Sequence, residues 1–373
     1  MLFNPVRIAY RAHSASITSL LIKNVTRISK PQLHSLVRYK SVKAELIEEQ
    51  PSIFTEQERK LAAQTRLKGL GPLVSKLPEK WIPYAELMRL EKPVGTWLLY
   101  IPCTWGILAA ATISSAPVLT TAYMLSIFGV GSLLMRGFGC TINDFLDRDM
   151  DSKVVRTIER PIASGRVTPK QAIVFAGAQL TTGLGIILLL PWDCFILGAI
   201  SLIPVCTYPL FKRFTYYPQA VLSFCFNWGV LLGFPAIGFF DWSVMTPLFL
   251  SSFFWTMTYD TIYAHQDKKF DVNAGVKSTA LAWGDHSKTI FKGLSVVQFS
   301  ALAVAGFNAG FLASPGFLIG SSIFGWKIFQ MIKKVNLDDP KDCWKYFMNN
   351  IGYGFYLTYG LLFDYLIQAL GLW

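Results

Sequence analysis

Three aspartates, Asp144, Asp147 and Asp151, follow a long apolar run at spacings of three and four residues. On a helix, all three carboxylates would project from one face within two turns. Like charges so close repel one another, and at the C-terminal end of a helix they also oppose its dipole. A bound cation would relieve this strain, and carboxylate oxygens suit Mg²⁺. The spacing therefore predicts a metal-dependent site, with a solvated acidic loop as the alternative.

A second acidic cluster predicts the other half of the same site. Asp260, Asp267 and Asp271 share one helical face if a helix continues through them, and Tyr263 lies on the same stripe. This cluster also ends an apolar segment, so we interpret the two as a pseudo-repeat whose halves face each other. All six aspartates are candidate catalytic residues. The predicted Mg²⁺ ligands are Asp144, Asp147, Asp151, Asp267 and Asp271.

A basic, glycine-containing loop follows each acidic cluster. Because a metal neutralises carboxylates while Arg and Lys hold outer phosphate oxygens, this interleaving indicates a site for Mg²⁺ and a diphosphate. Polar groups inside apolar helices are expensive, so Asn143 is expected to face a central cavity. Gln219 and Asn227 fit either that cavity or a hydrogen bond between helices. The candidate substrate-binding residues are Arg89, Asn143, Lys153, Arg156, Arg160, Arg213, Tyr263 and Lys277.

The composition is that of a polytopic membrane protein, because 52% of the 373 residues are hydrophobic and 16% are charged. A helix needs ~20 apolar residues to cross a bilayer core, and nine apolar runs approach or reach that length. The runs lie at about 94–113, 119–141, 170–190, 194–210, 218–239, 244–263, 289–312, 316–332 and 349–369. Prolines 191, 209, 218 and 315 are plausible stops between neighbouring helices. The expected fold is all-α, with nine transmembrane helices around a central cavity in residues 86–373.

Basic residues predict the orientation in the membrane. Seventeen Lys and Arg residues occupy the connectors on the side of the N-terminus and both acidic clusters, against none on the opposite side. The positive-inside rule therefore places the acidic clusters inside, which for a mitochondrial inner-membrane protein is the matrix.

The N-terminal segment has the composition of a mitochondrial presequence. Eight basic residues lie between Arg7 and Lys43, no acid precedes Glu45, and Ser, Thr and Leu fill the gaps. Residues 1–40 are the expected presequence, with a disordered basic tail as the alternative. Residues 41–85 are an expected matrix-side polar segment with a surface helix near 55–66. Because so much of the net charge of +12 lies here, nucleic acid is not an expected partner.

The motifs Asn143-Asp144-x-x-Asp147-x-x-x-Asp151 and Asp260-x-x-Tyr263-Ala264-x-x-Asp267-x-x-x-Asp271 closely resemble the two aspartate-rich signatures of the UbiA superfamily of intramembrane prenyltransferases. The resemblance covers about 86–373. Within the superfamily, the segments 160–166, 208–213 and 260–264 are most similar to those of 4-hydroxybenzoate polyprenyltransferases of ubiquinone synthesis. Haem O synthase, a sister enzyme, typically replaces acids in the first motif, and this chain does not.

The resemblance implies a reaction at the matrix-side mouth of the cavity. Mg²⁺ and the basic loops would bind the diphosphate of a polyprenyl donor and stabilise it as a leaving group. The ring of 4-hydroxybenzoate would attack the resulting allylic cation ortho to its hydroxyl, in a cavity that excludes water. Asp260 would accept a hydrogen bond from the phenol of the acceptor. Arg213 would bind the acceptor's carboxylate, with Arg89 and Arg136 next in line, and the alternative for Arg213 is an anchor of the helix end at the lipid headgroups. The lipid bilayer and other coenzyme Q biosynthesis proteins are the implied partners.

Two alternatives remain open. A transporter or channel for an anionic or divalent solute also needs charges in a polytopic protein, but transport sites usually lie near the midplane on broken helices. Here the charges gather at one mouth. The closer alternative is a superfamily enzyme that uses homogentisate, a naphthoate or haem as its acceptor.

Overall fold

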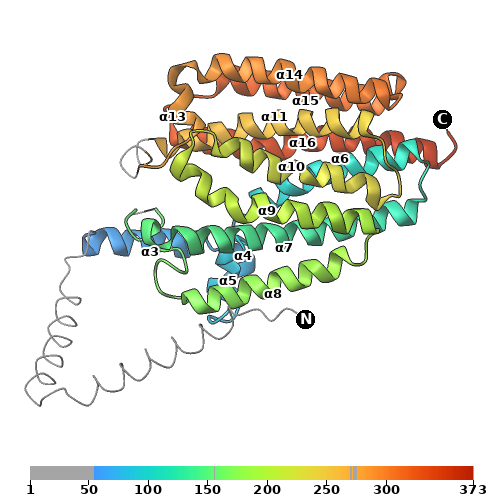
Figure 1. Cartoon of the computed structure of the whole chain (residues 1–373). Helices are drawn as coiled ribbons and strands as arrows, with labels where there is room; N and C mark the ends of the chain where they lie inside the picture. The colour runs from blue at the N-terminus through green and yellow to red at the C-terminus, as the bar shows by residue number, and fades with distance from the viewer. Residues whose placement is uncertain (1–53, 155, 269–270, 272–274, 373) are drawn as a thin grey trace, which may run out of the picture. The chain divides into compact units, whose positions relative to one another are not determined.

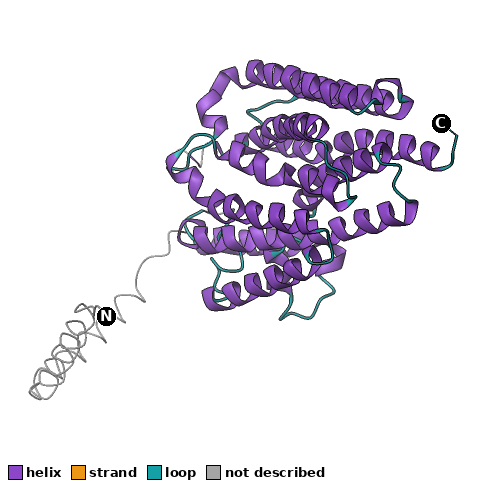
Figure 2. Cartoon of the chain, turned by 45° about the vertical axis from the view of Figure 1, so that its right-hand side comes forward, coloured by secondary structure: helices purple, strands orange, loops and turns teal. Residues whose placement is uncertain are grey.

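The structure, a computed structural model, describes residues 54–154, 156–268, 271 and 275–372. The expected presequence lies outside these ranges. Glu56–Trp373 forms one compact unit, and every regular element in its described residues is a helix (Figure 2). The predicted all-α class is therefore confirmed.

Nine helices of 19 residues or more account for most of the described chain. They are α6 (Val94–Ile113), α7 (Val118–Asp151), α8 (Pro169–Ile187), α9 (Trp192–Phe214), α10 (Pro218–Ala236), α11 (Trp242–His265), α14 (Ser287–Asn308), α15 (Pro315–Lys334) and α16 (Pro340–Ala369). Each overlaps one of the nine expected apolar runs. The long helices lie side by side, from α14 and α15 at one edge to α8 at the other (Figure 1).

Five segments of the described chain are long and apolar enough to cross a membrane: α6, α7, α9, α10 and Thr279–Asn308, which contains α14. Shorter helices precede the bundle and follow α11. These are α3 (Glu56–Gly69), α4 (Gly71–Val74), α5 (Ile82–Leu87) and α13 (Thr279–Trp283). Helix α3 overlaps the helix expected near 55–66, and α5 leads directly to the start of α6.

Helix ends differ from the expectation in two places that matter for the acidic clusters. Helix α7 continues beyond its apolar run to Asp151, so the first cluster lies on one unbroken helix. Helix α11 ends at His265 instead of continuing through Asp271. The amides of Gln266 and Asp267 bond to carbonyls three residues back, at 3.1 and 3.2 Å. Such bonds tighten the last turn, so the prediction of one continuous helical face for the second cluster was wrong.

Proline positions explain most of the remaining boundaries. Pro191 precedes the first residue of α9, and Pro218 and Pro315 are the first residues of α10 and α15. These positions suit proline because the first amides of a helix have no intrahelical partner. Pro209 was expected to stop a helix, yet α9 continues past it to Phe214. Neighbouring helices make such an interruption tolerable in an apolar environment.

Helix α6 lies at the centre of the bundle and packs against α7, α10 and α16. Glycine makes its contact with α10 close, because a Cβ on Gly106 would lie 2.4 Å from the Val230 carbonyl oxygen. Small residues allow this approach between membrane helices. Trp105 of α6 stacks on Trp255 of α11 with 5.2 Å between the ring centroids, and both side chains are fully buried. The core therefore holds α6, α10 and α11 in fixed relation, and all three helices contribute side chains to the cavity described below.

Several buried polar residues connect helices. Asp364 of α16 accepts hydrogen bonds from the amides of Gly316 and Phe317, at 2.7 and 2.6 Å, and so caps the N-terminus of α15. Asn227 of α10 donates to Thr256 of α11 at 2.8 Å. Of its two predicted roles, Asn227 therefore takes the hydrogen bond between helices.

Candidate active site

A cavity of about 700 Å³ opens where α7 and α11 end. Side chains of α6, α7, α8, α9, α10 and α11 line it, together with the turn before α6 and the loops that follow α7 and α11. The six predicted aspartates all lie in its wall: Asp144, Asp147, Asp151, Asp260, Asp267 and Asp271. The fold thus brings two acidic clusters more than a hundred residues apart in sequence to one space.

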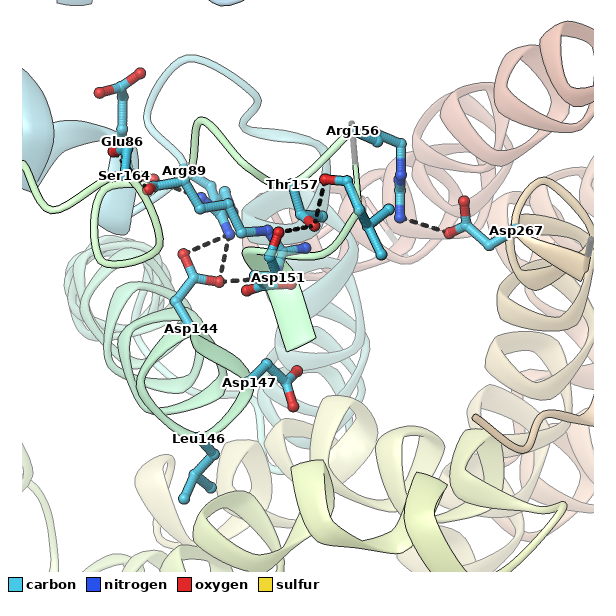
Figure 3. Close-up of polar contacts among 12 residues, drawn as sticks. Glu86, Arg89, Asp144, Leu146, Asp147, Asp151, Arg156, Thr157, Ser164 and Asp267 are labelled. Atoms are coloured by element: carbon cyan, nitrogen blue, oxygen red, sulfur yellow. Dashed lines mark hydrogen bonds and ion pairs between the residues drawn. The ribbon is translucent and has the colours of Figure 1, made fainter. Parts of the chain in front are cut away.

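Two arginines neutralise the first cluster (Figure 3). Arg89, in the turn between α5 and α6, donates to both oxygens of Asp144 at 2.7 and 2.8 Å. Arg160 donates to Asp144 at 3.1 Å and to Asp151 at 2.8 Å. Burial alone would lower the pKa of Arg89, but the carboxylate of Asp144 raises it above its ordinary value. Charge-assisted bonds of this kind relieve the repulsion between carboxylates on one helical face.

Asp147 has one buried carboxylate oxygen that no described residue bonds. Lys212 of α9 donates to Oδ2. Oδ1 is buried and has no hydrogen-bond partner in the described part of the chain, and the closest nitrogen of Arg213 lies 3.9 Å from it. In Figure 3 the carboxylate points away from the Arg89–Asp144 pair. A buried oxygen without a partner is costly, so this atom is suited to bind a ligand that brings positive charge.

The second cluster is connected to the first loop across the cavity. Arg156 donates to Asp267 at 2.7 Å (Figure 3). Burial raises the pKa of Asp267, although Arg156 and Arg160 oppose the shift. Burial, and then the charge of Asp267, raise the pKa of Asp271 to about 6 against the opposing effects of Arg156 and Lys212. The nearby basic residues therefore do not fully offset the cost of burying these negative charges, and a bound cation would stabilise them.

Backbone hydrogen bonds position the loop that follows the second cluster. The amide of Lys277 donates to the carbonyl of Lys212 at 2.9 Å, and the Lys277 ammonium donates to the Phe214 carbonyl at 3.1 Å. Gln219 of α10 accepts from the amide of Thr279 at 3.0 Å. Gln219 also lines the cavity, so it fulfils both of its predicted roles. The loop thereby brings Lys277 to the rim beside Lys212.

Six of the eight predicted substrate-binding residues line the cavity: Arg89, Asn143, Arg156, Arg160, Tyr263 and Lys277. Lys153 does not, because it follows the end of α7 and is exposed to solvent. Arg213 also lies outside the lining. Its side chain is 47% exposed and donates to the Leu146 carbonyl at 2.9 Å. Adjacent residues on a helix point about 100° apart, so Lys212 faces the cavity and Arg213 does not.

Arg136 of α7 is the cavity residue that the sequence prediction ranked too low. It lies on the cavity wall eight residues before Asp144, about 12 Å deeper along the helix. It makes no hydrogen bond or ion pair with any residue that the structure describes, and its guanidinium lies 5.4 Å from the centre of the Phe226 ring. Its charge acts on Asp260. The available signal was that Arg136 is the sole charged residue in the run 119–141.

Apolar side chains line the rest of the cavity. They come from α6, α7, α8, α9 and α10 and include Phe128, Leu184, Ile187, Leu202, Leu222 and Leu232. Phe128 precedes Asp144 by 16 residues, which is about 24 Å along α7. The cavity therefore has a charged mouth and a long apolar part, which we call the apolar arm.

Comparison with known proteins identifies similar sequences. Residues 99–353 match the UbiA prenyltransferase family. The chain is 62% identical over 323 residues to the mitochondrial 4-hydroxybenzoate polyprenyltransferase of Saccharomyces cerevisiae, covering 87% of each protein. It is 47% identical over 291 residues to the human protein of the same name, covering 78% of this chain and 77% of that one.

Solved structures share the fold. A UbiA homologue from Aeropyrum pernix K1 in its apo form superposes with a TM-score of 0.60 at 17% identity, over 72% of this chain and 97% of that one. A UbiA homologue from Archaeoglobus fulgidus bound to DMAPP and Mg²⁺ gives a TM-score of 0.53 at 19% identity, over 74% and 98%. At these identities the likeness supports the arrangement of helices alone.

Proposed function

Because the chain belongs to the UbiA prenyltransferase family, we propose that it transfers a polyprenyl group from a polyprenyl diphosphate to 4-hydroxybenzoate, at the ring carbon ortho to the hydroxyl. The observation that carries this proposal is one cavity with a charged mouth and an apolar arm. A polyprenyl diphosphate has the same two parts, a charged head and a hydrocarbon tail. The relatives named 4-hydroxybenzoate polyprenyltransferase support the acceptor.

The residues at the mouth fit Mg²⁺. Asp147 Oδ1 is a buried oxygen without a hydrogen-bond partner among the described residues, and carboxylates are hard oxygen ligands. Asp144, Asp147, Asp151, Asp267 and Asp271 would hold the metal, and the Mg²⁺ bound to the Archaeoglobus fulgidus homologue supports this choice. Among the described residues, no three Asp, Glu, His or Cys side chains are close enough together to hold one ion. Asp144, Asp147, Asp151 and Asp267 each form an ion pair with Arg or Lys. Bound Mg²⁺ would stabilise the charge that develops on the departing diphosphate.

The protein's own bases would bind and orient the donor. Arg89, Arg156, Arg160, Lys212 and Lys277 converge on the mouth from four segments, and their N–H groups can hold phosphate oxygens. The bond between the prenyl carbon and the bridging oxygen breaks, and diphosphate leaves with the electron pair. The ring carbon of the acceptor forms the new carbon–carbon bond and loses its proton. The apolar walls exclude water, which would otherwise capture the allylic cation.

The acceptor would lie deeper, between Arg136 and Asp260. Both residues are about two turns further from the mouth than the metal-directed acids, and both line the cavity. Arg136 has an unpaired guanidinium, which can bind a carboxylate with two parallel hydrogen bonds. Asp260 can accept the hydrogen bond of the phenol and increase the electron density of the ring. The structure therefore favours Arg136 over Arg213, which lies outside the cavity lining, for the acceptor's carboxylate.

Kinetics of two lysine variants test this assignment. Arg136→Lys keeps the charge but removes the planar fork, so KM for 4-hydroxybenzoate should rise at least about tenfold while KM for the donor changes little. Arg213→Lys, the matched control, should leave KM for 4-hydroxybenzoate within about twofold. The opposite pattern would return the carboxylate to Arg213.

The activity itself is tested with purified protein in lipid. The assay supplies a polyprenyl diphosphate, Mg²⁺ and a panel of aromatic acids that includes homogentisate and a naphthoate. We expect prenylation of 4-hydroxybenzoate ahead of the other acids, and loss of turnover when EDTA removes the metal. Preference for another acid would change the acceptor while keeping the enzyme class.

The proposed setting is the mitochondrial inner membrane, with nine membrane-spanning helices and the mouth toward the matrix. The relatives' mitochondrial names support the organelle. The distribution of seventeen basic connector residues supports the orientation. Each of the nine long helices of the described chain has 19 residues or more. A bilayer core requires ~20, so each is long enough to span it.

A further inference from the structure

Glu86 of α5 is a buried carboxylate that joins three segments of the chain. Its side chain is 6% exposed. Oε1 accepts from Arg66 of α3 at 3.3 Å, and Oε2 accepts from Arg166 in the loop that follows α7. Arg66 also lies 3.3 Å from Glu159 of that loop. Because a buried charge is tolerated when it is paired, α3, α5 and the loop meet at a compensated site.

The same turn of chain leads from Glu86 to the cavity mouth. Arg89 has a φ of 57°, in the left-handed region that arginine rarely occupies. One of its terminal nitrogens donates to the Glu86 carbonyl at 2.9 Å and the other to Asp144. In Figure 3 the Glu86 carboxylate is turned away from Asp144. Backbone strain of this kind persists where surrounding contacts impose it, and it is common at functional sites.

The loop that Glu86 binds through Arg166 carries two arginines of the cavity mouth, Arg156 and Arg160. Arg160 binds Asp144 and Asp151, and Arg156 binds Asp267. Leu87, fully buried next to Glu86, packs with Ile162 and Val167 of the loop. A shift of the loop relative to α5 would therefore displace bases that serve both acidic clusters.

We propose that Glu86 is a positioning residue for donor binding. By binding Arg66 and Arg166, it holds the loop 156–166 and the strained turn at Arg89 in one arrangement, so that their bases converge on the diphosphate. This assigns a role to α3 through α5, which precede the residues matched to the family, 99–353. The identity of the ligand rests on the proposed function, whereas the ion pair between Glu86 and Arg166 of the loop does not.

The test compares Glu86→Gln with wild type in lipid. Glutamine keeps the volume and removes the charge, so Arg166 loses its ionic partner and Arg66 keeps only its ion pair with Glu159. Displacements of about 1 Å cost up to about 100-fold in rate, and we expect KM for the polyprenyl diphosphate to rise at least about tenfold. KM for 4-hydroxybenzoate should stay within about twofold, and Glu86→Asp should restore part of the donor's KM. Glu79→Gln, an exposed glutamate of the same segment, is the matched control.

Tryptic cleavage after Arg156 and Arg166 measures the loop directly. It should be at least about threefold faster in Glu86→Gln than in wild type or Glu79→Gln, because the loop opens more often. An unchanged donor KM, equal rises in both KM values, or unchanged cleavage would overturn the proposal. If Glu86→Gln does not fold, Arg66→Gln should show the same changes in smaller degree, and wild-type values there would also overturn it.

The design separates this inference from the proposed function. If wild type does not prenylate 4-hydroxybenzoate, the proposed function fails, but cleavage of the loop still reports on the grip of Glu86. Calorimetric binding of inorganic pyrophosphate with Mg²⁺ then replaces the donor's KM. Weaker binding by Glu86→Gln than by Glu79→Gln supports the positioning role, and equal binding contradicts it.

Discussion

Among single residues, Asp147 gives the sharpest test of the proposed metal site, because one of its buried oxygens has no hydrogen-bond partner in the described chain. Asp147→Asn keeps the volume and removes the charge, so kcat should fall at least about 100-fold while the protein still inserts. Asp149→Asn is the control, since the side chain of Asp149 is 84% exposed on the same helix. Turnover near wild type in Asp147→Asn would contradict the metal assignment.

Asp271 links the site to pH. Its pKa in the folded protein, about 6, lies above the ordinary 3.8 because of burial and the charge of Asp267. The folded state therefore binds the proton more tightly than the unfolded chain. The resulting stability is fully present below about pH 4 and is lost as pH rises through about 6.

Thermal unfolding in EDTA checks this sign. Asp271→Asn removes a carboxylate whose charge is unfavourable above about pH 6, so its Tm should exceed that of wild type at pH 7.5. The difference should shrink toward zero near pH 4, where the wild-type carboxyl is neutral. A lower Tm for the variant at pH 7.5 would show that the charge is compensated without metal.

At the scale of helices, we expect α8 to contact the donor's hydrocarbon tail, because its side chains line the apolar arm. Gly183 lines the cavity, and a Cβ there would lie 3.5 Å from the Met135 sulfur, an ordinary contact. Gly183→Leu should fold and narrow the arm. The kcat/KM for a long polyprenyl diphosphate should fall several-fold more than that for geranyl diphosphate, because the longer tail needs more of the arm.

A second glycine of α8 supplies the control. Gly177 is outside the cavity lining and a Cβ there meets no atom within 4 Å. Gly177→Leu should therefore leave the preference between long and short donors unchanged. If Gly183→Leu reduces the use of both donors equally, the tail lies elsewhere.

For the whole molecule, the orientation in the membrane is open to chemical labelling. Ser152, in the turn after α7, is exposed on the side of both acidic clusters. A cysteine at 152 should be shielded from an impermeant thiol reagent in intact mitoplasts and labelled once they are opened. Labelling in intact mitoplasts would place the mouth on the other side of the membrane.

The sequence alone was enough to predict where the long helices lie and that both acidic clusters line one cavity. Apolar runs of spanning length reflect the need to satisfy every backbone hydrogen bond in lipid within a helix, and nine long helices overlap them. The spacing of Asp144, Asp147 and Asp151 is a local property of one helix, so their common face could be predicted.

The tertiary structure decided which basic residues reach those acids. Arg136 and Lys212 line the cavity, and Lys212 bonds Asp147 of a helix far away in sequence. Glu86 likewise bonds Arg166, 80 residues further along the chain. Arg213 and Lys153 carry the same charge as the cavity's bases but lie outside its lining. Side-chain direction at a helix end depends on a rotation of about 100° per residue and on packing. Two neighbouring residues can therefore point in different directions: the side chain of Lys212 lines the cavity, whereas that of Arg213 is largely exposed.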